Sequence, residues 1–107
     1  MKYANLNEMI GGWFLGDFEP SIYKTNQFEV GIKEYKKGNK ELKHLHKIAT
    51  EITVIIRGKV KMNNKLINEG QIILLKPNEA ADFVVLEDTI TAVVKFPSTT
   101  NDKYFVG

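Results

Sequence analysis

The feature that most constrains the fold of this chain is a series of short apolar segments, each closed by turn-forming residues, that begins after residue 27. In the first segment, Phe28, Val30 and Ile32 alternate with polar or small residues, which is the pattern of a half-buried β-strand. The later segments are rich in Val, Ile and Thr and recur at intervals of roughly 8–12 residues, without an amphipathic helix between them. This pattern predicts an all-β sandwich or barrel. The expected strands cover residues 28–32, 51–57, 59–62, 65–68, 71–75, 82–86 and 89–96.

Two of the connections between these strands have a recognisable chemistry. Asn63 and Asn64 form a pair that suits a two-residue hairpin, because Asn tolerates the positive φ that such a turn requires. Residues 36–43 lack an apolar pattern and are expected to form a loop.

The charge balance argues against nucleic acid as a partner. The chain carries 15 basic and 13 acidic residues, a net charge of +2, whereas a nucleic-acid surface requires a basic cluster on one face. The densest basic stretch, residues 33–47, is interrupted by Glu34 and Glu41. We interpret it as a solvated loop.

The length of 107 residues fits one domain with a single core. Within it, we expect residues 28–96 to form the barrel and residues 97–107 to form a C-terminal tail. Residues 1–27 are apolar in part and are expected to cover the barrel or to pack on a second copy of the chain. The apolar residues between Leu6 and Trp13 favour a short helical turn in this first segment.

The absence of cysteine excludes disulfides, thiolate zinc sites and cysteine nucleophiles. Asn5, Asn7 and Glu8 interrupt the apolar run that a secretory signal needs. Residues 10–15 are too few and too rich in glycine to cross a membrane. We therefore expect a cytoplasmic protein without a membrane partner.

The only two histidines, His44 and His46, lie within a frame of fixed spacing that runs from Gly38 through Glu51 to Gly58. In an extended strand, residues i and i + 2 project from the same face, so both imidazoles enter one space. A carboxylate from the next strand, Glu51, would complete a set of two histidines and one carboxylate. Such a set suits Fe, Mn, Zn or Ni and leaves coordination positions open. Outside such a frame, the same residues would be exposed side chains at the edge of a loop.

With these residues the chain resembles the cupin superfamily. Residues 38–58 match the first motif of that family at every fixed position. The second motif is expected at residues 70–81, where the resemblance is weaker. Lys76 stands at the position of the motif's proline, Asn78 replaces its turn glycine, and Ala81 occupies the position of the third metal-binding histidine.

Ala81 has no donor atom, so the resemblance implies fewer protein ligands than a complete cupin site has. Asp82 is the nearest substitute in the sequence. Strand alternation turns Asp82 away from the direction that Ala81 faces, and only a β-bulge would bring it inward.

The resemblance implies a double-stranded β-helix, or jelly-roll barrel, with one site inside it. The implied metal ligands are His44, His46 and Glu51, which would hold one divalent transition metal, Fe, Mn, Ni or Zn. The implied ligand is a small polar metabolite, with oxygenase or isomerase chemistry, and the implied assembly is a homodimer. Because the superfamily includes enzymes, storage proteins and sensors, this fold does not select a function.

Two metal-free alternatives stay open. In the first, the barrel is a non-catalytic module that binds or senses a ligand. In the second, it is a sugar-nucleotide isomerase in which an inward histidine acts as general base, a role suited to the pKa of imidazole. That chemistry needs a tyrosine as acid, and Tyr35 is the nearest strand residue of this type, which makes Tyr35 a candidate substrate-binding residue.

Overall fold

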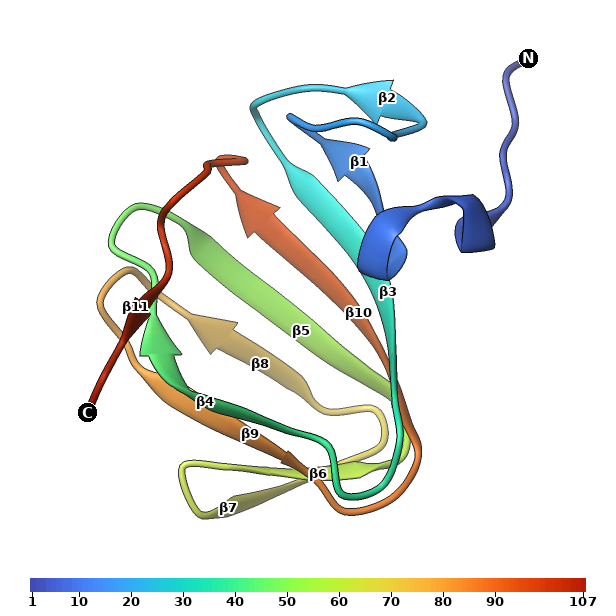
Figure 1. The fold of residues 1–107 in the computed structure, drawn as a ribbon. Coiled ribbons are helices and arrows are strands. Elements are labelled where there is room, and N and C mark those ends of the chain that lie inside the picture. The colour runs from blue at the N-terminus through green and yellow to red at the C-terminus, as the bar shows by residue number, and fades with distance from the viewer.

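In the computed structural model, which describes all 107 residues, two β-sheets face each other as the layers of a flattened barrel (Figure 1). The larger sheet has six strands in the order β2-β1-β3-β10-β5-β8, and the smaller has five in the order β11-β4-β9-β6-β7. The all-β prediction is therefore confirmed. Two 3-10 turns, η1 (Leu6–Glu8) and η2 (Ile10–Gly12), precede β1 (Trp13–Gly16), β2 (Tyr23–Lys24), β3 (Glu29–Tyr35), β4 (Lys40–Leu45), β5 (Thr50–Arg57), β6 (Lys59–Met62), β7 (Lys65–Asn68), β8 (Ile72–Leu75), β9 (Ala81–Val85), β10 (Thr89–Phe96) and β11 (Tyr104–Phe105).

The predicted hairpin between β6 and β7 is confirmed. Asn63 and Asn64 adopt φ values of 48° and 65°, and the residues on either side of them, Met62 and Lys65, are partners in the ladder. Both turn residues are thus in the left-handed region that the two-residue hairpin requires.

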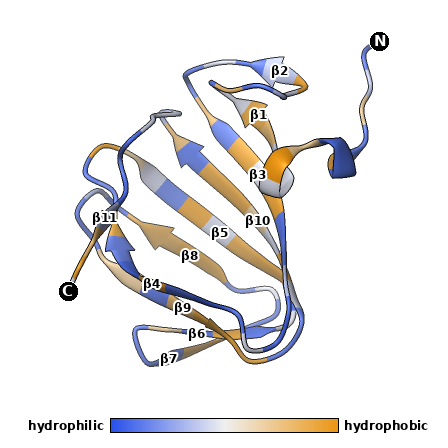
Figure 2. Cartoon of the chain, viewed as in Figure 1, coloured by the Kyte–Doolittle hydropathy of each residue, from blue (hydrophilic) through white to orange (hydrophobic).

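One expected loop is wrong. Sequence analysis places a loop at residues 36–43, but Lys40–Leu45 forms strand β4, which pairs with β9 on one side and with β11 on the other. Lys40, Glu41 and Lys43 of β4 are charged, and the strand is largely hydrophilic (Figure 2). The strand therefore lacks an apolar pattern, and its ladder partners determine its conformation.

The central strands of the larger sheet turn their polar side inward. A half-buried strand ordinarily turns its apolar side to the core. In β3, however, Glu29 is 9% exposed, whereas Phe28, just before the strand, is 47% exposed. The residues paired with Glu29 across the sheet belong to the same inward row. This row consists of Glu29, Lys95, Glu51 and Leu75, and all four residues line one cavity.

The apolar core fills only one end of the barrel. Five buried side chains form it, and three of them are fully enclosed. They come from the far end of β5 and from β6, β7 and β9, where the sheets converge in Figure 1. The other end of the barrel interior is left for polar groups. The core residues are Ile55, Val60, Ile67, Phe83 and Val85.

The segments on either side of residues 28–96 extend both sheets. Strands β1 and β2 continue the larger sheet beyond β3, and β11 continues the smaller sheet beyond β4. The first residues extend away from the sheets (Figure 1), with Tyr3 83% exposed. None of the helical turns has the length and apolarity needed to cross a bilayer.

Gly58, the last residue of the histidine frame, connects β5 to β6. A substitution at Gly58 tests how closely this turn packs on the residues around the start of β10. Its φ is 106°, and a Cβ atom there would lie 2.6 Å from the Asp88 carbonyl oxygen and closer still to Thr89 Oγ1. We predict that Gly58→Ala lowers the free energy of unfolding by about 2–4 kcal/mol, because backbone strain and a clash with backbone add. Urea unfolding followed by the fluorescence of Trp13, the only tryptophan, measures this loss.

Gly38→Ala is the matched control, since Gly38 has a φ of 93° but nothing lies within 4 Å of an added Cβ. Strain alone should cost this variant about 1 kcal/mol. Equal losses in the two variants would contradict the packing argument.

Candidate functional site

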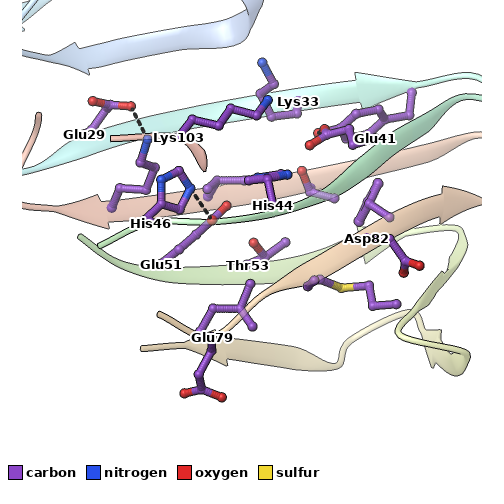
Figure 3. Close-up of a pocket in the computed structure, with 18 of the residues that line it drawn as sticks. Glu29, Lys33, Glu41, His44, His46, Glu51, Thr53, Glu79, Asp82 and Lys103 are labelled. Carbon is purple, nitrogen blue, oxygen red and sulfur yellow. Dashed lines mark hydrogen bonds and ion pairs between the residues drawn. The ribbon is translucent and has the colours of Figure 1, made fainter. Parts of the chain in front are cut away.

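A cavity of about 290 Å³ lies between the two sheets and reaches Phe83 of the apolar core at one end; Figure 3 shows the residues that line it. This volume is near the lower limit of roughly 300 Å³ for small-molecule pockets. Side chains from β3, β4, β5, β9 and β10 and from the segment before β11 line it. Charged and hydroxyl-bearing groups make up much of the wall. They include Lys33, Tyr35, His44, His46, Glu51 and Thr91.

His46 and Glu51 form a close pair of titratable groups in the cavity. His46 Nε2 lies 3.4 Å from Glu51 Oε2, and the two side chains are only 11% and 19% exposed. The hydrogen bond to Glu51 raises the pKa of His46 above its ordinary value, although burial and the charge of Lys95 oppose it. Burial would raise the pKa of Glu51, but the bond to His46 and the nearby positive charges outweigh it and lower that pKa. Both shifts favour an imidazolium–carboxylate pair.

Both histidines are held by the ring nitrogen that faces away from this pair. His46 Nδ1 lies 2.9 Å from the Asp102 carbonyl oxygen, and His44 Nδ1 lies 2.9 Å from the Leu42 carbonyl oxygen. Because a carbonyl only accepts, each Nδ1 donates, and the lone pair of each neutral ring is at Nε2. Metal-binding histidines are oriented in this way. The ring centroids lie 5.5 Å apart, in an edge-to-face arrangement.

The carboxylate of Asp102 fixes the turn that carries these groups. Asp102 is 4% exposed and accepts the backbone N–H groups of Lys47, Ile48 and Ala49 at 2.9–3.1 Å. Burial would raise its pKa, but the three backbone bonds outweigh it and hold the pKa below the ordinary value. The turn lies between His46 and β5, so Asp102 positions both members of the His46–Glu51 pair. In the sequence, Asp102 falls in the expected C-terminal tail. Its role is not predicted, because no local pattern marks a side chain that binds the backbone of a turn far away in the chain.

Ala81, at the position of the missing histidine, and Asp82, its nearest substitute, behave as the strand alternation predicts. Ala81 pairs with His44 across β9 and β4, is 5% exposed and lines the cavity without supplying a donor. The Asp82 carboxylate borders the cavity but accepts the backbone N–H of Asn63 at 2.7 Å, in the β6–β7 hairpin. Asp82 therefore does not replace the missing histidine.

The three residues fit a metal in donor type, and His46 and Glu51 also fit it in geometry. His46 Nε2 and Glu51 Oε2 have the separation of two ligands of one ion, since atoms about 2.1 Å from a metal lie roughly 3.0–3.4 Å apart at octahedral or tetrahedral angles. No three His, Asp or Glu side chains converge as they stand. His44 has to turn its Nε2 toward the His46–Glu51 pair for all three donors to share one ion.

Tyr35 lies in the cavity, but its hydroxyl group already has a partner. The hydroxyl donates to Glu41 Oε2 at 3.0 Å, and the ring packs on Phe83 with centroids 5.0 Å apart. Burial, followed by the charge of Glu41 and the bond to it, raises the pKa of Tyr35 well above its ordinary value. A phenol held in this way is a poor proton donor.

Sequence analysis also misses the lysines of the cavity. Lys95 Nζ lies 3.2 Å from Glu29 Oε2 in a pair that is almost buried. Lys33 and Lys95 lie over the ring of Trp13, at 5.1 and 5.7 Å from its centroid. In the sequence, Lys33 lies on the same polar side of β3 as Glu29. This side faces the cavity only because the strand turns its polar side inward, which the sequence alone does not show.

Sequence comparisons do not relate this chain to a known protein. No family model matches it, and no curated protein sequence matches it either.

Comparison with solved structures shows the fold. A conserved protein with a double-stranded β-helix domain from Klebsiella pneumoniae is 19% identical, with a TM-score of 0.69 over 77% of this chain and 72% of that one. A sugar phosphate isomerase of the cupin superfamily from Silicibacter pomeroyi is 19% identical, with a TM-score of 0.60 over 65% of this chain and 50% of that one. The Bacillus subtilis oxalate decarboxylase, described for its Mn(II) centres, is 15% identical, with a TM-score of 0.64 over 77% of this chain and 25% of that one. The chain therefore has the double-stranded β-helix fold of the cupins, as the resemblance implied.

The role of Asp102 in the turn gives a direct prediction. In Asp102→Asn, an NH₂ group that cannot accept replaces one carboxylate oxygen, so at least one of the three backbone N–H groups loses its partner. We predict a loss of about 1–3 kcal/mol in the free energy of unfolding, measured in urea. Asp17→Asn is the control, because the Asp17 carboxylate is exposed and makes no hydrogen bond or ion pair, and it should change stability by less than about 0.5 kcal/mol. Similar losses in the two variants would show that the turn does not depend on this carboxylate.

Proposed function

We propose that this cupin-fold chain binds a small polar metabolite in its cavity and holds one divalent metal through His44, His46 and Glu51. The observation that carries the proposal is the pairing of His46 with Glu51, in a ring oriented by the Asp102 carbonyl group. The size and the polar lining of the cavity support a small polar ligand. When bound, the metal would act as a Lewis acid on an oxygen atom of the metabolite.

The chain's own residues would orient the ligand and limit access to it. The bond that His46 Nδ1 donates to the Asp102 carbonyl oxygen orients His46, and the bond that His44 Nδ1 donates to the Leu42 carbonyl oxygen places the lone pair of His44 at Nε2. Ala81 presents only a methyl group opposite His44, which leaves space for a ligand atom where a complete cupin site has a histidine. We propose an oxygenation or an isomerisation as the reaction class. Manganese is the first metal to test, since the similar oxalate decarboxylase has Mn(II) centres.

A binding module without metal is the second candidate function. The specific observation in its favour is that both pKa shifts of the His46–Glu51 pair favour an ion pair, which needs no metal to be satisfied. The isomerase form of this alternative has less support, because the Tyr35 hydroxyl donates to Glu41 and its pKa is raised.

Metal removal and reconstitution test the leading proposal. Protein stripped with EDTA and then titrated with Mn(II) is expected to retain one ion per chain after desalting, measured by elemental mass spectrometry. Bound Mn(II) should also quench the fluorescence of Trp13, which lines the same cavity. His46→Gln removes a donor and is expected to weaken metal binding by at least about tenfold.

Glu79→Gln is the control for this titration, because Glu79 lines the cavity but its Oε1 accepts the backbone N–H of Lys76. Its affinity for Mn(II) should equal that of the parent. A parent that retains none of Mn(II), Fe(II), Ni(II) and Zn(II), or a His46→Gln variant that binds as the parent does, would refute the metal proposal and favour the binding module.

We further propose that the chain is a homodimer that pairs through the outer face of the larger sheet. On that face, two rows of apolar residues run across β3, β10, β5 and β8. Their side chains point away from the cavity. Ile72 and Leu74 on the edge strand β8 are 67% and 50% exposed, and Figure 2 shows β8 as apolar along its length. A second copy fits this face because a two-fold interface pairs the same patch on both chains. The rows are Val30, Val94, Ile52 and Leu74, and Ile32, Ala92, Val54 and Ile72.

Sedimentation velocity tests the homodimer. The parent should sediment with twice the mass of one chain, and the double variant Ile72→Lys, Leu74→Lys should sediment as a monomer, because charges on this face lose their water in the interface. Leu42→Lys is the control, since Leu42 is also 67% exposed but lies on β4 of the other sheet, and it should stay dimeric. A monomeric parent, or a dimer that survives the double variant, would contradict the proposed face.

A further inference from the structure

One buried hydroxyl group in the cavity wall has no partner within the chain. Thr91 is 1% exposed, and its Oγ1 is the only buried side-chain nitrogen or oxygen without a hydrogen bond. Such groups are rare, because an unpaired buried donor loses its bonds to water without replacement. Thr91 lines the cavity, so a molecule in the cavity can supply the missing partner.

Lys33 lies beside Thr91 and also lacks a partner. The two residues are opposite each other in the β3–β10 ladder, and both line the cavity. The Lys33 ammonium group makes no ion pair and lies 5.1 Å from the ring centroid of Trp13. Burial lowers the pKa of Lys33. The charge of Glu41 opposes this shift, whereas Lys103 and Lys95 add to it.

Lys103 brings a second unpaired ammonium group to the same place. It reaches the cavity from the segment before β11, far from Lys33 in the sequence, and both lysines lie on one side of the cavity, across from Thr53 and Glu79 (Figure 3). Lys103 makes no ion pair, and its ammonium group lies 5.4 Å from the ring centroid of Phe105. Two positive charges held close together repel each other, and an anion between them would offset this repulsion.

The carboxylates of the cavity, by contrast, all have partners. One pairs with Lys95, one with Tyr35 and one with His46, and the other two accept backbone N–H groups. The charged groups of the cavity without an ion-pair or hydrogen-bond partner in the chain are therefore the ammonium groups of Lys33 and Lys103, and the unpaired buried hydroxyl of Thr91 lies beside Lys33. The five partnered carboxylates are Glu29, Glu41, Glu51, Glu79 and Asp82.

We propose that Lys33, Lys103 and Thr91 form a subsite for an anionic group, a carboxylate or a phosphate, of the molecule that the cavity takes. The proposal rests on the proposed function, because it assigns the substrate class of the same cavity: a small anionic metabolite that spans from the lysines to the histidines. Ammonium and hydroxyl donors bind carboxylate and phosphate oxygens by charge-assisted hydrogen bonds. With a volume of about 290 Å³, the cavity is large enough for one small molecule of this class.

Anion binding to metal-free protein tests the subsite apart from the metal site. EDTA-treated protein is titrated with inorganic phosphate, with D-glycerate and with neutral glycerol, and binding is followed by calorimetry and by Trp13 fluorescence. At least one of the two anions should bind and glycerol should not, and the tighter anion identifies the preferred group. Lys33→Gln and Lys103→Gln should each raise the Kd of that anion by roughly tenfold or more. Lys37→Gln should leave it unchanged, because Lys37 is exposed and outside the cavity.

Thr91→Val separates a ligand-binding hydroxyl from a structural one. Valine has nearly the same shape without the hydroxyl, so the variant should raise the Kd for the anion and also raise the Tm of the ligand-free protein. A structural hydroxyl would instead give a lower Tm. Failure of both anions to bind, an unchanged Kd in the lysine variants, or a lower Tm in Thr91→Val would overturn the subsite. Mn(II) binding by the same lysine variants reports independently on the metal site, so failure of one proposal is distinguishable from failure of the other.

Discussion

The carboxylate of Asp102 holds the turn between β4 and β5, and the geometry of the cavity depends on this interaction. Three consecutive N–H groups point at one side chain, and only an acceptor with two oxygens satisfies them all. The carbonyl oxygen of the same residue accepts a hydrogen bond from His46 Nδ1–H. One residue near the end of the chain thus fixes both the backbone that leads to Glu51 and the position of the lone pair on His46.

On the inner face of the larger sheet, the buried charged groups also lie next to groups of opposite charge. Lys95 stands between Glu29 and Glu51 in the ladder, and Glu51 in turn faces His46. Charges alternate along this row, so each buried group has an opposite neighbour, which buried charges require. The apolar residues that alternate with this row, such as Val30, Val94 and Ile52, point outward. A polar interior and an apolar exterior on one sheet would account together for the proposed ligand inside the cavity and for the proposed second copy outside it.

The sequence predicts the strands that carry an apolar pattern and the Asn63-Asn64 hairpin, because local chemistry determines these features. The sequence does not predict β4. The charged side chains of this strand leave it without an apolar pattern, and its pairing with β9 and β11 determines its conformation. The histidine frame identifies His46 and Glu51 as neighbours, since the spacing is local. Lys33, Lys103 and Asp102 are not predictable in this way, because their roles come from contacts between distant segments and from which face of β3 turns inward.

The most direct test of the account is a two-bond ¹H–¹⁵N spectrum of the histidine rings, recorded at a pH above the imidazole range. The chain has only two histidines, so each ring gives a separate pattern. The account predicts that both rings carry their proton on Nδ1, and that one equivalent of Zn(II) shifts both Nε2 resonances while Nδ1 stays protonated. A proton on Nε2 in the metal-free protein, or Nε2 resonances unmoved by excess Zn(II), would contradict it.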